Sequence, residues 1–262
     1  IVMAVEMCDP SIDFANIDMV IVYPSLMERS FGPKPMIETE EGSFTKPMPH
    51  IRLNEFDQGT VTHEIGHSAL GLGHANRIDC GEDSFRSDYV NCNVIEYGNI
   101  FDVMGLSLRG HLGAWYKYLA GRAFNKQWVS TQTIQSDGEY TLKALEVSTE
   151  GKQLLRIPYQ VHPLCIEYRK PIGIDGEIRD LLSGDAFGAL QTIPQNGGIL
   201  LNLCYTDNPR ERGIVDLPFA HIMSGSALVI DVSPHVHNNL NDQERDNADI
   251  FLQEGVLFQN EA

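Results

Sequence analysis

The sequence predicts an α+β protein in two parts, and three observations support this. Its 262 residues, of which 42% are apolar, suffice for one large domain or two ordinary ones. Two helical patterns lie before residue 130, beside strand-like runs. Short apolar or alternating runs, separated by Gly, Pro, Asn and Asp, fill the rest of the chain. We therefore expect a mixed domain over residues 1–130 and a β-rich, sandwich-like domain over residues 131–262.

Two strands are expected near the start of the first part. The continuous apolar run Ile17–Tyr23 ends at Pro24, a pattern typical of a buried strand. Residues 30–50 are punctuated by Gly and Pro and predict loops. The segment Ile51–Asn54 then alternates between apolar and polar side chains, which predicts a short strand at a sheet edge.

Two helices are expected in the same part of the chain. Residues Gly59–Leu70 form a helical pattern, with Thr60 or Asp57 available as the N-cap and Gly71 as the terminator. Residues Gly110–Ala123 predict a second helix. Their apolar side chains recur at i, i+3, i+4 and i+7, namely Leu112, Trp115, Tyr116 and Leu119.

The second part contains six runs that predict strands. Clusters of turn-forming residues separate them, as in a sandwich or barrel. The runs are Tyr140–Leu145, Leu154–Tyr159, Leu164–Tyr168, Gly198–Tyr205, Ala227–Val232 and Val256–Phe258.

Charge and hydropathy exclude two classes of partner. The chain has 36 acidic and 19 basic residues, a formal net charge of −17. That balance repels a phosphate backbone, so we expect no nucleic-acid partner. No apolar run approaches the roughly 18 residues of a membrane span, so we expect none.

The cysteine spacing favours an oxidising compartment. Cys80 and Cys92 bracket a short polar segment, as a disulfide that staples a loop would. Cys165 and Cys204 lie in strand-like runs that could pair across a sheet, which leaves Cys8 over. The chain does not begin with Met and shows no signal peptide, so we expect a processed or truncated product of a secreted protein.

One segment, residues 63–74, carries recognisable chemistry. His63 and His67 are four residues apart, so a helix presents both rings on one side, where each can reach a zinc ion at about 2.0–2.1 Å. Gly71 and Gly73 can turn the chain out of the helix at positive φ, so that His74 reaches the same metal. Three imidazoles leave a fourth position for water, as in catalytic zinc sites.

Glu64 directly follows the first histidine and suits the role of general base. It projects beside the two rings and can contact a zinc-activated water without becoming a ligand. A zinc ion lowers the pKa of that water and polarises a carbonyl, and Glu64 then transfers the proton to the leaving amine. The segment therefore predicts metal-assisted hydrolysis with one catalytic Zn²⁺.

The motif resembles the extended zinc signature of the metzincin metallopeptidases, and residues 101–105 look like their Met-turn. Met104 would then form the apolar floor beneath the zinc ligands. Within that clan, the chain more closely resembles the gametolysin-like peptidases and their bacterial relatives. This resemblance rests on four further segments, residues 96–99, 111–117, 166–175 and 228–234. It implies a metzincin-like catalytic domain, with a mixed sheet and an active-site helix, in residues 1–130.

This chain departs from the family pattern at three places. The zinc motif is one residue longer, because Ser68, Ala69 and Leu70 separate His67 from the glycine. We expect a wider turn or a π-bulge to absorb the extra residue. Asn99 stands where the family has an acid, and Leu106 stands where some metzincins have a Tyr that assists the oxyanion.

Other polar groups are interpreted as structural or solvated. His111 begins the second helix and suits a core or capping role, and Cys8 is not expected to bind the zinc. Two solvated histidines explain His235 and His237 better than a second metal. An acidic loop, residues 242–249, lacks the glycine of a calcium-binding hand. A Ca²⁺ ion in the acidic segment 79–88 is left open.

The sequence thus predicts a secreted zinc endopeptidase with Glu64 as general base. The strand at Ile51–Asn54 would hold an extended protein or peptide substrate by strand addition. The resemblance implies extracellular substrates, glycoproteins among them. Two alternatives stay open: a glycan- or protein-binding module with a structural or lapsed zinc site, and a zinc hydrolase of non-peptide substrates.

Overall fold

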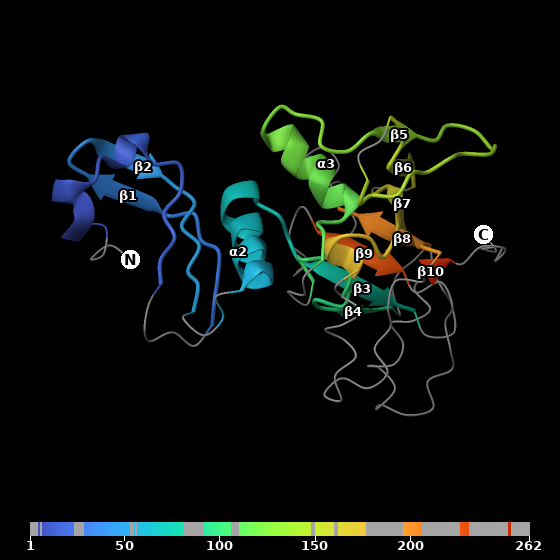
Figure 1. Ribbon diagram of the computed structural model, residues 1–262, viewed down its shortest axis with the longest axis horizontal. Helices are drawn as coiled ribbons and strands as arrows, with labels where there is room; N and C mark the ends of the chain where they lie inside the picture. The colour runs from blue at the N-terminus through green and yellow to red at the C-terminus, as the bar shows by residue number, and fades with distance from the viewer. Residues whose placement is uncertain are drawn as a thin grey trace, which may run out of the picture. The chain divides into compact units, whose positions relative to one another are not determined.

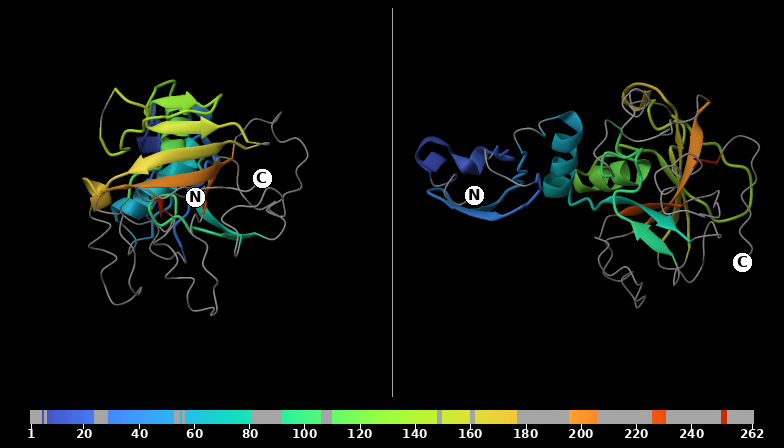
Figure 2. Two further views of the ribbon diagram at one scale, coloured as in Figure 1. Left: turned by 90° about the vertical axis from the view of Figure 1, so that its right-hand side faces the viewer. Right: turned by 90° about the horizontal axis from the view of Figure 1, so that it is seen from below.

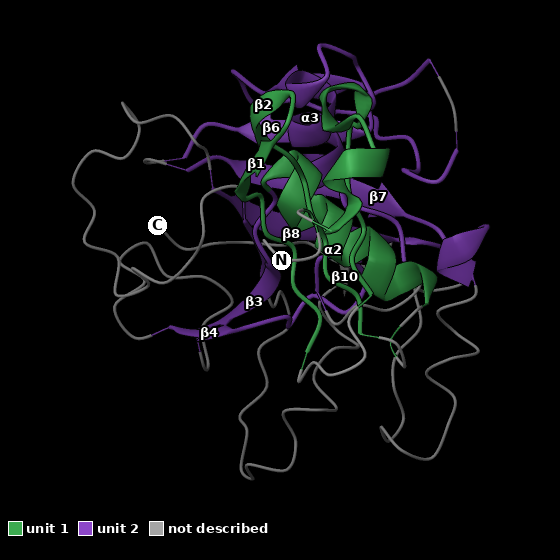
Figure 3. Ribbon diagram, turned by 90° about the vertical axis from the view of Figure 1, so that its left-hand side faces the viewer, with its two compact units in different colours: residues 1–71 green, residues 72–262 purple. Residues whose placement is uncertain are grey.

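The structure is a computed structural model of the 262-residue chain. It describes about three fifths of the chain, in twelve stretches. These are residues 5, 7–23, 29–52, 55, 57–80, 92–105, 110–147, 150–159, 162–176, 196–205, 226–230 and 251–252. The chain divides into two compact units, residues 1–71 and 72–262, coloured separately in Figure 3.

The described part of unit 1 contains a β-hairpin, two short 3-10 helices and a long α-helix. Strands β1 (Met36–Thr39) and β2 (Gly42–Thr45) pair antiparallel across a tight turn. The 3-10 helices η1 (Asp9–Ser11) and η2 (Phe14–Asn16) precede them. A small core holds this part together, made of Val5, Phe14, Ile37 and Met48.

Helix α2 (Gln58–Leu70) confirms the first predicted helix, and its ends show why it begins and stops there. Asp57 is the N-cap, since its Oδ1 accepts hydrogen bonds from the backbone N–H groups of Gly59 (2.8 Å) and Thr60 (3.1 Å). Gly71 ends the helix in the left-handed conformation, with φ of 65°. Of the two predicted caps, Asp57 is therefore the one used.

The predicted strand Ile17–Tyr23 is wrong except at one bridge. Val20 and Val22 donate to the carbonyls of Pro47 and Pro49, each at 3.0 Å, and only Val22 forms a bridge, with His50. Prolines have no N–H to return, so the partner segment cannot complete a ladder. The side chains of Ile21 and Tyr23 are accordingly exposed rather than buried.

The predicted free edge at Ile51–Asn54 is also wrong where the structure describes it. The N–H of Ile51 donates to Val22 O at 2.9 Å, and that of Arg52 donates to Ser30 Oγ at 3.0 Å. His50, just before them, is bridged on both sides. These donors are engaged within unit 1, so residues 51–52 offer no free edge. Residues 53–54 lie outside the described part.

The described strands of unit 2 form one eight-stranded mixed sheet (Figures 1 and 2). Seven strands follow the order β4-β3-β9-β8-β7-β6-β5, and β10 pairs with β8. The pairs β3–β9 and β5–β6 are parallel, and the other pairs are antiparallel. The strands are β3 (Ala75–Asp79), β4 (Asn93–Ile95), β5 (Thr131–Thr133), β6 (Leu154–Ile157), β7 (Leu164–Arg169), β8 (Gly198–Cys204), β9 (Ala227–Ile230) and β10 (Phe251–Leu252).

The structure divides the chain at residue 71 rather than near residue 130. Strand β3 pairs with β9 from Ala75↔Ala227 to Ile78↔Ile230, so segments on both sides of residue 130 share one sheet. The α+β class is confirmed. A C-terminal sandwich is not, because every described strand after residue 72 belongs to this sheet. The boundary near residue 130 was predicted from a change in composition, but strand pairing joins segments from both sides of that residue.

The predicted strands of the second part are confirmed at β6, β7, β8 and β9. The run Tyr140–Leu145 forms only one bridge, between Ala144 and Tyr168. The run Val256–Phe258 lies outside the described residues. Helix α3 (Ala114–Ala123) confirms the core of the second predicted helix, which begins four residues later than expected.

Both predicted disulfides form within unit 2. Cys80 is bonded to Cys92, and Cys165 on β7 is bonded to Cys204 on β8, while Cys8 is free and exposed. The first disulfide joins a buried apolar cluster that includes Ile78, Leu201, Leu203, Leu228 and Ile230. No described helix is long and apolar enough to cross a membrane.

Candidate metal centre

Helix α2 presents two imidazoles on one side, as its period predicts. The Nε2 atoms of His63 and His67 face each other at 3.0 Å, and the two rings meet edge to face with centroids 4.6 Å apart. The backbone at Gly32 packs closely against the turn of α2 that carries Glu64 and His67. A Cβ atom there would lie 2.3 Å from Glu64 O and 2.7 Å from His67 Cβ, so only glycine fits.

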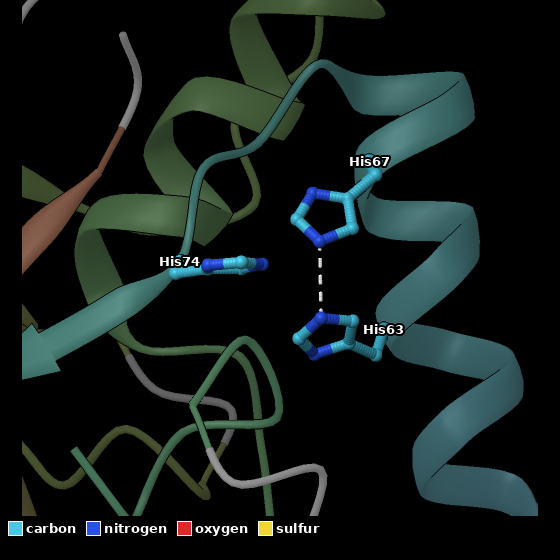
Figure 4. Close-up of side chains that lie close together, drawn as sticks. All are labelled: His63, His67 and His74. Carbon is cyan, nitrogen blue, oxygen red and sulfur yellow. Dashed lines mark hydrogen bonds between the residues drawn. The ribbon is translucent and has the colours of Figure 1, made fainter. Parts of the chain in front are cut away.

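His74 completes the group after the chain leaves the helix. The ligand nitrogens of His63, His67 and His74 all lie within 4.8 Å of one another (Figure 4). The helix stays α-helical through Leu70, so no π-bulge absorbs the extra residue of the motif. The chain turns at Gly71 alone, since Gly73 does not adopt a positive φ. An irregular stretch, residues 71–74, then leads into β3.

A carboxylate orients the third imidazole. Nδ1 of His74 lies 2.8 Å from Oε1 of Glu96, and its ring packs on Tyr97 with centroids 4.0 Å apart. A histidine ligand commonly donates its second ring N–H to a carboxylate, which fixes the tautomer and leaves the other nitrogen for the metal. Glu96 belongs to the family-like segment 96–99, but the sequence alone assigned it no role.

The three donors fit a zinc ion. Two nitrogens bound to zinc at about 2.1 Å are roughly 3.4 Å apart in a tetrahedron and never more than about 4.2 Å. The 3.0 Å separation on α2 and the 4.8 Å upper limit for all three differ from these distances by less than about 1 Å. Neutral imidazoles are ligands that zinc prefers, and three of them leave the fourth position open.

Glu64 is a buried carboxylate with spare hydrogen-bonding capacity. It is 6% exposed, and among the described residues no donor lies within reach of its Oε2. Burial, with a smaller contribution from the negative charge of Glu55, raises the pKa of Glu64 to about 7. A carboxyl group with a pKa near neutrality can both accept and return a proton.

Met104 occupies a tight, fully buried turn of unit 2, residues 99–105. Its N–H donates to Oδ1 of Asp102, and its carbonyl accepts from the N–H of Ala75, both at 2.8 Å. A Cβ at position 105 would lie 1.9 Å from Asn99 O, so Gly105 is required. The turn therefore lies against the residue that follows His74. Its role as a floor beneath the ligands stays a prediction.

The other predicted groups are not among the three ligands, or they lie outside the described residues. His111 is half-buried, its N–H donates to Asp175 Oδ1 at 2.8 Å, and burial lowers the pKa of its ring. The Oδ1 atom of Asn99 accepts from the N–H of Phe101 at 3.1 Å, a structural role. Of the acidic segment 79–88, only residues 79 and 80 are described. Leu106, His235, His237 and residues 242–249 lie outside the described part.

Comparison with known proteins assigns no relative. No protein-family model, no curated protein and no solved structure matches this chain. The residues of the centre and their geometry therefore carry the functional argument.

Proposed function

We propose that this chain is a zinc-dependent endopeptidase, in which His63, His67 and His74 hold the metal and Glu64 is the general base. The observation that carries the proposal is the convergence of three imidazole nitrogens within 4.8 Å of one another. A buried carboxylate directly follows the first of these histidines in the chain. A purely structural zinc site has four protein ligands and no use for such a carboxylate.

The division of labour follows from these positions. A bound zinc ion would supply Lewis acidity, lowering the pKa of a water molecule and polarising the scissile carbonyl. Glu64 would take the proton of that water and deliver it to the leaving amine. Glu96 would hold His74 in the tautomer that leaves Nε2 for the metal.

The substrate and location follow from the resemblance and the disulfides. Similarity to gametolysin-like peptidases favours extracellular protein substrates, glycoproteins among them. Two disulfides suit an oxidising compartment outside the cytosol. Residues 51–52 are paired within unit 1, so strand addition at that segment does not form part of the proposal.

The proposal is tested by measuring zinc content and casein cleavage together. Glu64→Gln should keep about one zinc per chain and lose at least about 100-fold in cleavage rate, because it removes only the base. Glu41→Gln makes the same chemical change in the exposed β1–β2 turn and should leave both readouts unaltered. His74→Ala should lose most of the zinc, whereas His111→Ala should retain it.

Two results would overturn the proposal. If the parent chain binds no zinc under these conditions, the three histidines do not form a metal centre and the proposal fails. If the parent chain binds zinc but cleaves neither casein nor a peptide library, it is a binding module or a zinc hydrolase of non-peptide substrates. Ester and amide panels then separate a non-peptide hydrolase from a binding module.

A further inference from the structure

A cluster of charges is buried in unit 2, away from the three histidines in sequence. Arg169, on β7, is fully buried and its guanidinium contacts three carboxylates. Its Nε atom lies 2.9 Å from Oε1 of Glu146, its Nη1 lies 3.2 Å from Oε1 of Glu167, and its Nε lies 3.0 Å from Oδ2 of Asp175. We name these four residues the Arg169 cluster.

The charges in this cluster depend on one another. Burial opposes the charge of Arg169, but Asp175 and the two glutamates raise its pKa overall. Burial alone would raise the pKa of Asp175, yet Arg169 and hydrogen bonds lower it. Burial raises the pKa of Glu146 to about 7. Apolar side chains would often stabilise such a site equally well, so these charges point to a role in holding neighbouring segments in place.

The cluster holds the turn that carries Met104. Nη2 of Arg169 donates to the carbonyl of Phe101 at 2.9 Å. The next residue, Asp102, uses one oxygen to accept from Met104 N–H (2.8 Å) and the other to accept from Gly113 N–H (2.6 Å). The 99–105 turn is thus fixed from both sides, by Arg169 and by the start of α3.

The same cluster also fixes the start of α3. Oε2 of Glu167 accepts a hydrogen bond from the N–H of Ala114, the first residue of the helix. With Asp102 on Gly113, two buried carboxyl groups accept hydrogen bonds from the first N–H groups of the helix, which have no partner within it. A Cβ at Gly113 would lie 2.5 Å from Oδ2 of Asp102, so the approach is close.

From this turn the contacts reach the third imidazole. Ala75 directly follows His74, and both of its backbone polar groups are bonded to the turn. Its N–H donates to Met104 O at 2.8 Å, and its carbonyl accepts from Asn99 N–H at 3.1 Å. A shift of the turn must therefore move the backbone that carries His74.

We propose that Arg169, with Glu146, Glu167 and Asp175, positions His74 for metal binding through the 99–105 turn. The inference rests on the proposed metal centre and adds to it a set of positioning residues distant in sequence. None of them is a ligand. Their contribution is the placement of one imidazole, so it should disappear when that imidazole is removed.

A double-mutant cycle on zinc affinity tests this. Arg169→Lys keeps the charge but loses the planar fork, and should weaken Zn²⁺ binding about 10-fold, within the range for outer-shell residues of metal sites. In a His74→Ala background the same substitution should change the remaining affinity by less than about twofold. An equal loss in both backgrounds, or no loss in the parent background, would overturn the proposal.

Matched variants guard against general destabilisation. Arg156→Lys alters another arginine of the same sheet, bonded to Tyr118 at 2.9 Å and not to the turn, and should leave zinc affinity unchanged. If Arg169→Lys does not fold, Glu146→Gln takes its place in the cycle with the same expected pattern. Loss of zinc affinity in Arg156→Lys would point to a merely structural effect and would contradict the proposal.

Amide hydrogen exchange separates this inference from the proposed function. In metal-free protein, Arg169→Lys should speed exchange of the Ala75 N–H, which is bonded to Met104 O. Arg156→Lys should not. If the parent chain binds no zinc but Ala75 responds in this way, the proposed function fails while the mechanical link stands. An unchanged Ala75 exchange rate would overturn the link itself.

Discussion

The pair of histidines on α2 and the Arg169 cluster are two ways of bringing charged or polar side chains together. His63 and His67 are four residues apart and meet because a helix repeats every 3.6 residues. Arg169 meets Glu146 and Phe101 across 23 and 68 residues of chain. The first arrangement needs one helix, and the second needs the whole sheet. We therefore expect substitutions in the cluster to lower the free energy of unfolding more than substitutions that affect α2 alone.

The largest effect is expected within the cluster. Asp175→Ala removes one of the three carboxylates that contact the buried guanidinium of Arg169. It should lower the free energy of unfolding by about 3–5 kcal/mol. Urea denaturation of the zinc-free protein measures it. Asp137→Ala, the same change at an exposed residue, should cost less than about 0.5 kcal/mol. Similar losses in the two variants would show that the cluster is not energetically special.

Stability should also depend on pH through Asp102. Burial raises the pKa of this carboxyl group to about 7 in the folded protein, against 3.8 as its reference value. The folded state therefore holds a proton that the unfolded state has lost, and stability falls as pH rises from about 4 to 7, by up to about 4 kcal/mol. Asp102→Asn cannot ionise and should show a shallower slope in urea unfolding at several pH values. An identical slope would contradict the shift.

On α2 the largest expected effect comes from the chain that packs against it. Gly32→Ala would place a methyl group against Glu64 O and His67 Cβ, and should lower the free energy of unfolding by about 2 kcal/mol. Gly138→Ala is the control, because its Cβ would meet only Tyr140, at an ordinary 3.7 Å. Thermal unfolding compares the two. Equal melting temperatures would mean that the backbone near residue 32 shifts to accommodate the methyl group without loss of stability.

Glu96, the hydrogen-bond partner of His74, should have a smaller effect, on zinc affinity rather than on the stability of the fold. Glu96→Gln keeps the size of the side chain but weakens the hydrogen bond at Nδ1, so zinc affinity should fall about 10-fold. Competition with a chelator measures it. Because Glu96 is largely exposed, the melting temperature should hardly change. A large loss of stability with unchanged zinc affinity would reverse the assignment.

The smallest effect is expected at the helix cap. Asp57→Ala removes the acceptor for Gly59 and Thr60 N–H and should cost about 1 kcal/mol in urea unfolding. Asp18→Ala, at an exposed position outside the helices, serves as its control. A cost near that of Asp175→Ala would erase the contrast between local and long-range arrangements.

Local reasoning predicted much of the candidate centre. Helix α2, an N-cap at Asp57 or Thr60, the end at Gly71 and the shared face of His63 and His67 all follow from interactions within about four residues, and the structure selects Asp57. The strands β6 to β9 were recognisable because apolar runs were bounded by turn residues.

Errors arose where the partner segment decides the outcome. Ile17–Tyr23 has the composition of a strand, but its neighbour contributes Pro47 and Pro49, which cannot donate. Ile51 and Arg52 alternate as an edge would, yet other parts of unit 1 accept their N–H groups. The boundary near residue 130 followed composition, whereas β3 pairs with a strand more than a hundred residues later.

By itself the sequence determined α2, its end at Gly71 and the adjacent Glu64, because helix period and capping act over short distances. It also indicated which cysteines pair, although Cys165 and Cys204 lie 39 residues apart on neighbouring strands. Only the tertiary structure decided that Glu96 meets His74 and that Arg169 is buried among three carboxylates. Burial and strand pairing depend on which distant segments become neighbours, and no local pattern encodes that choice.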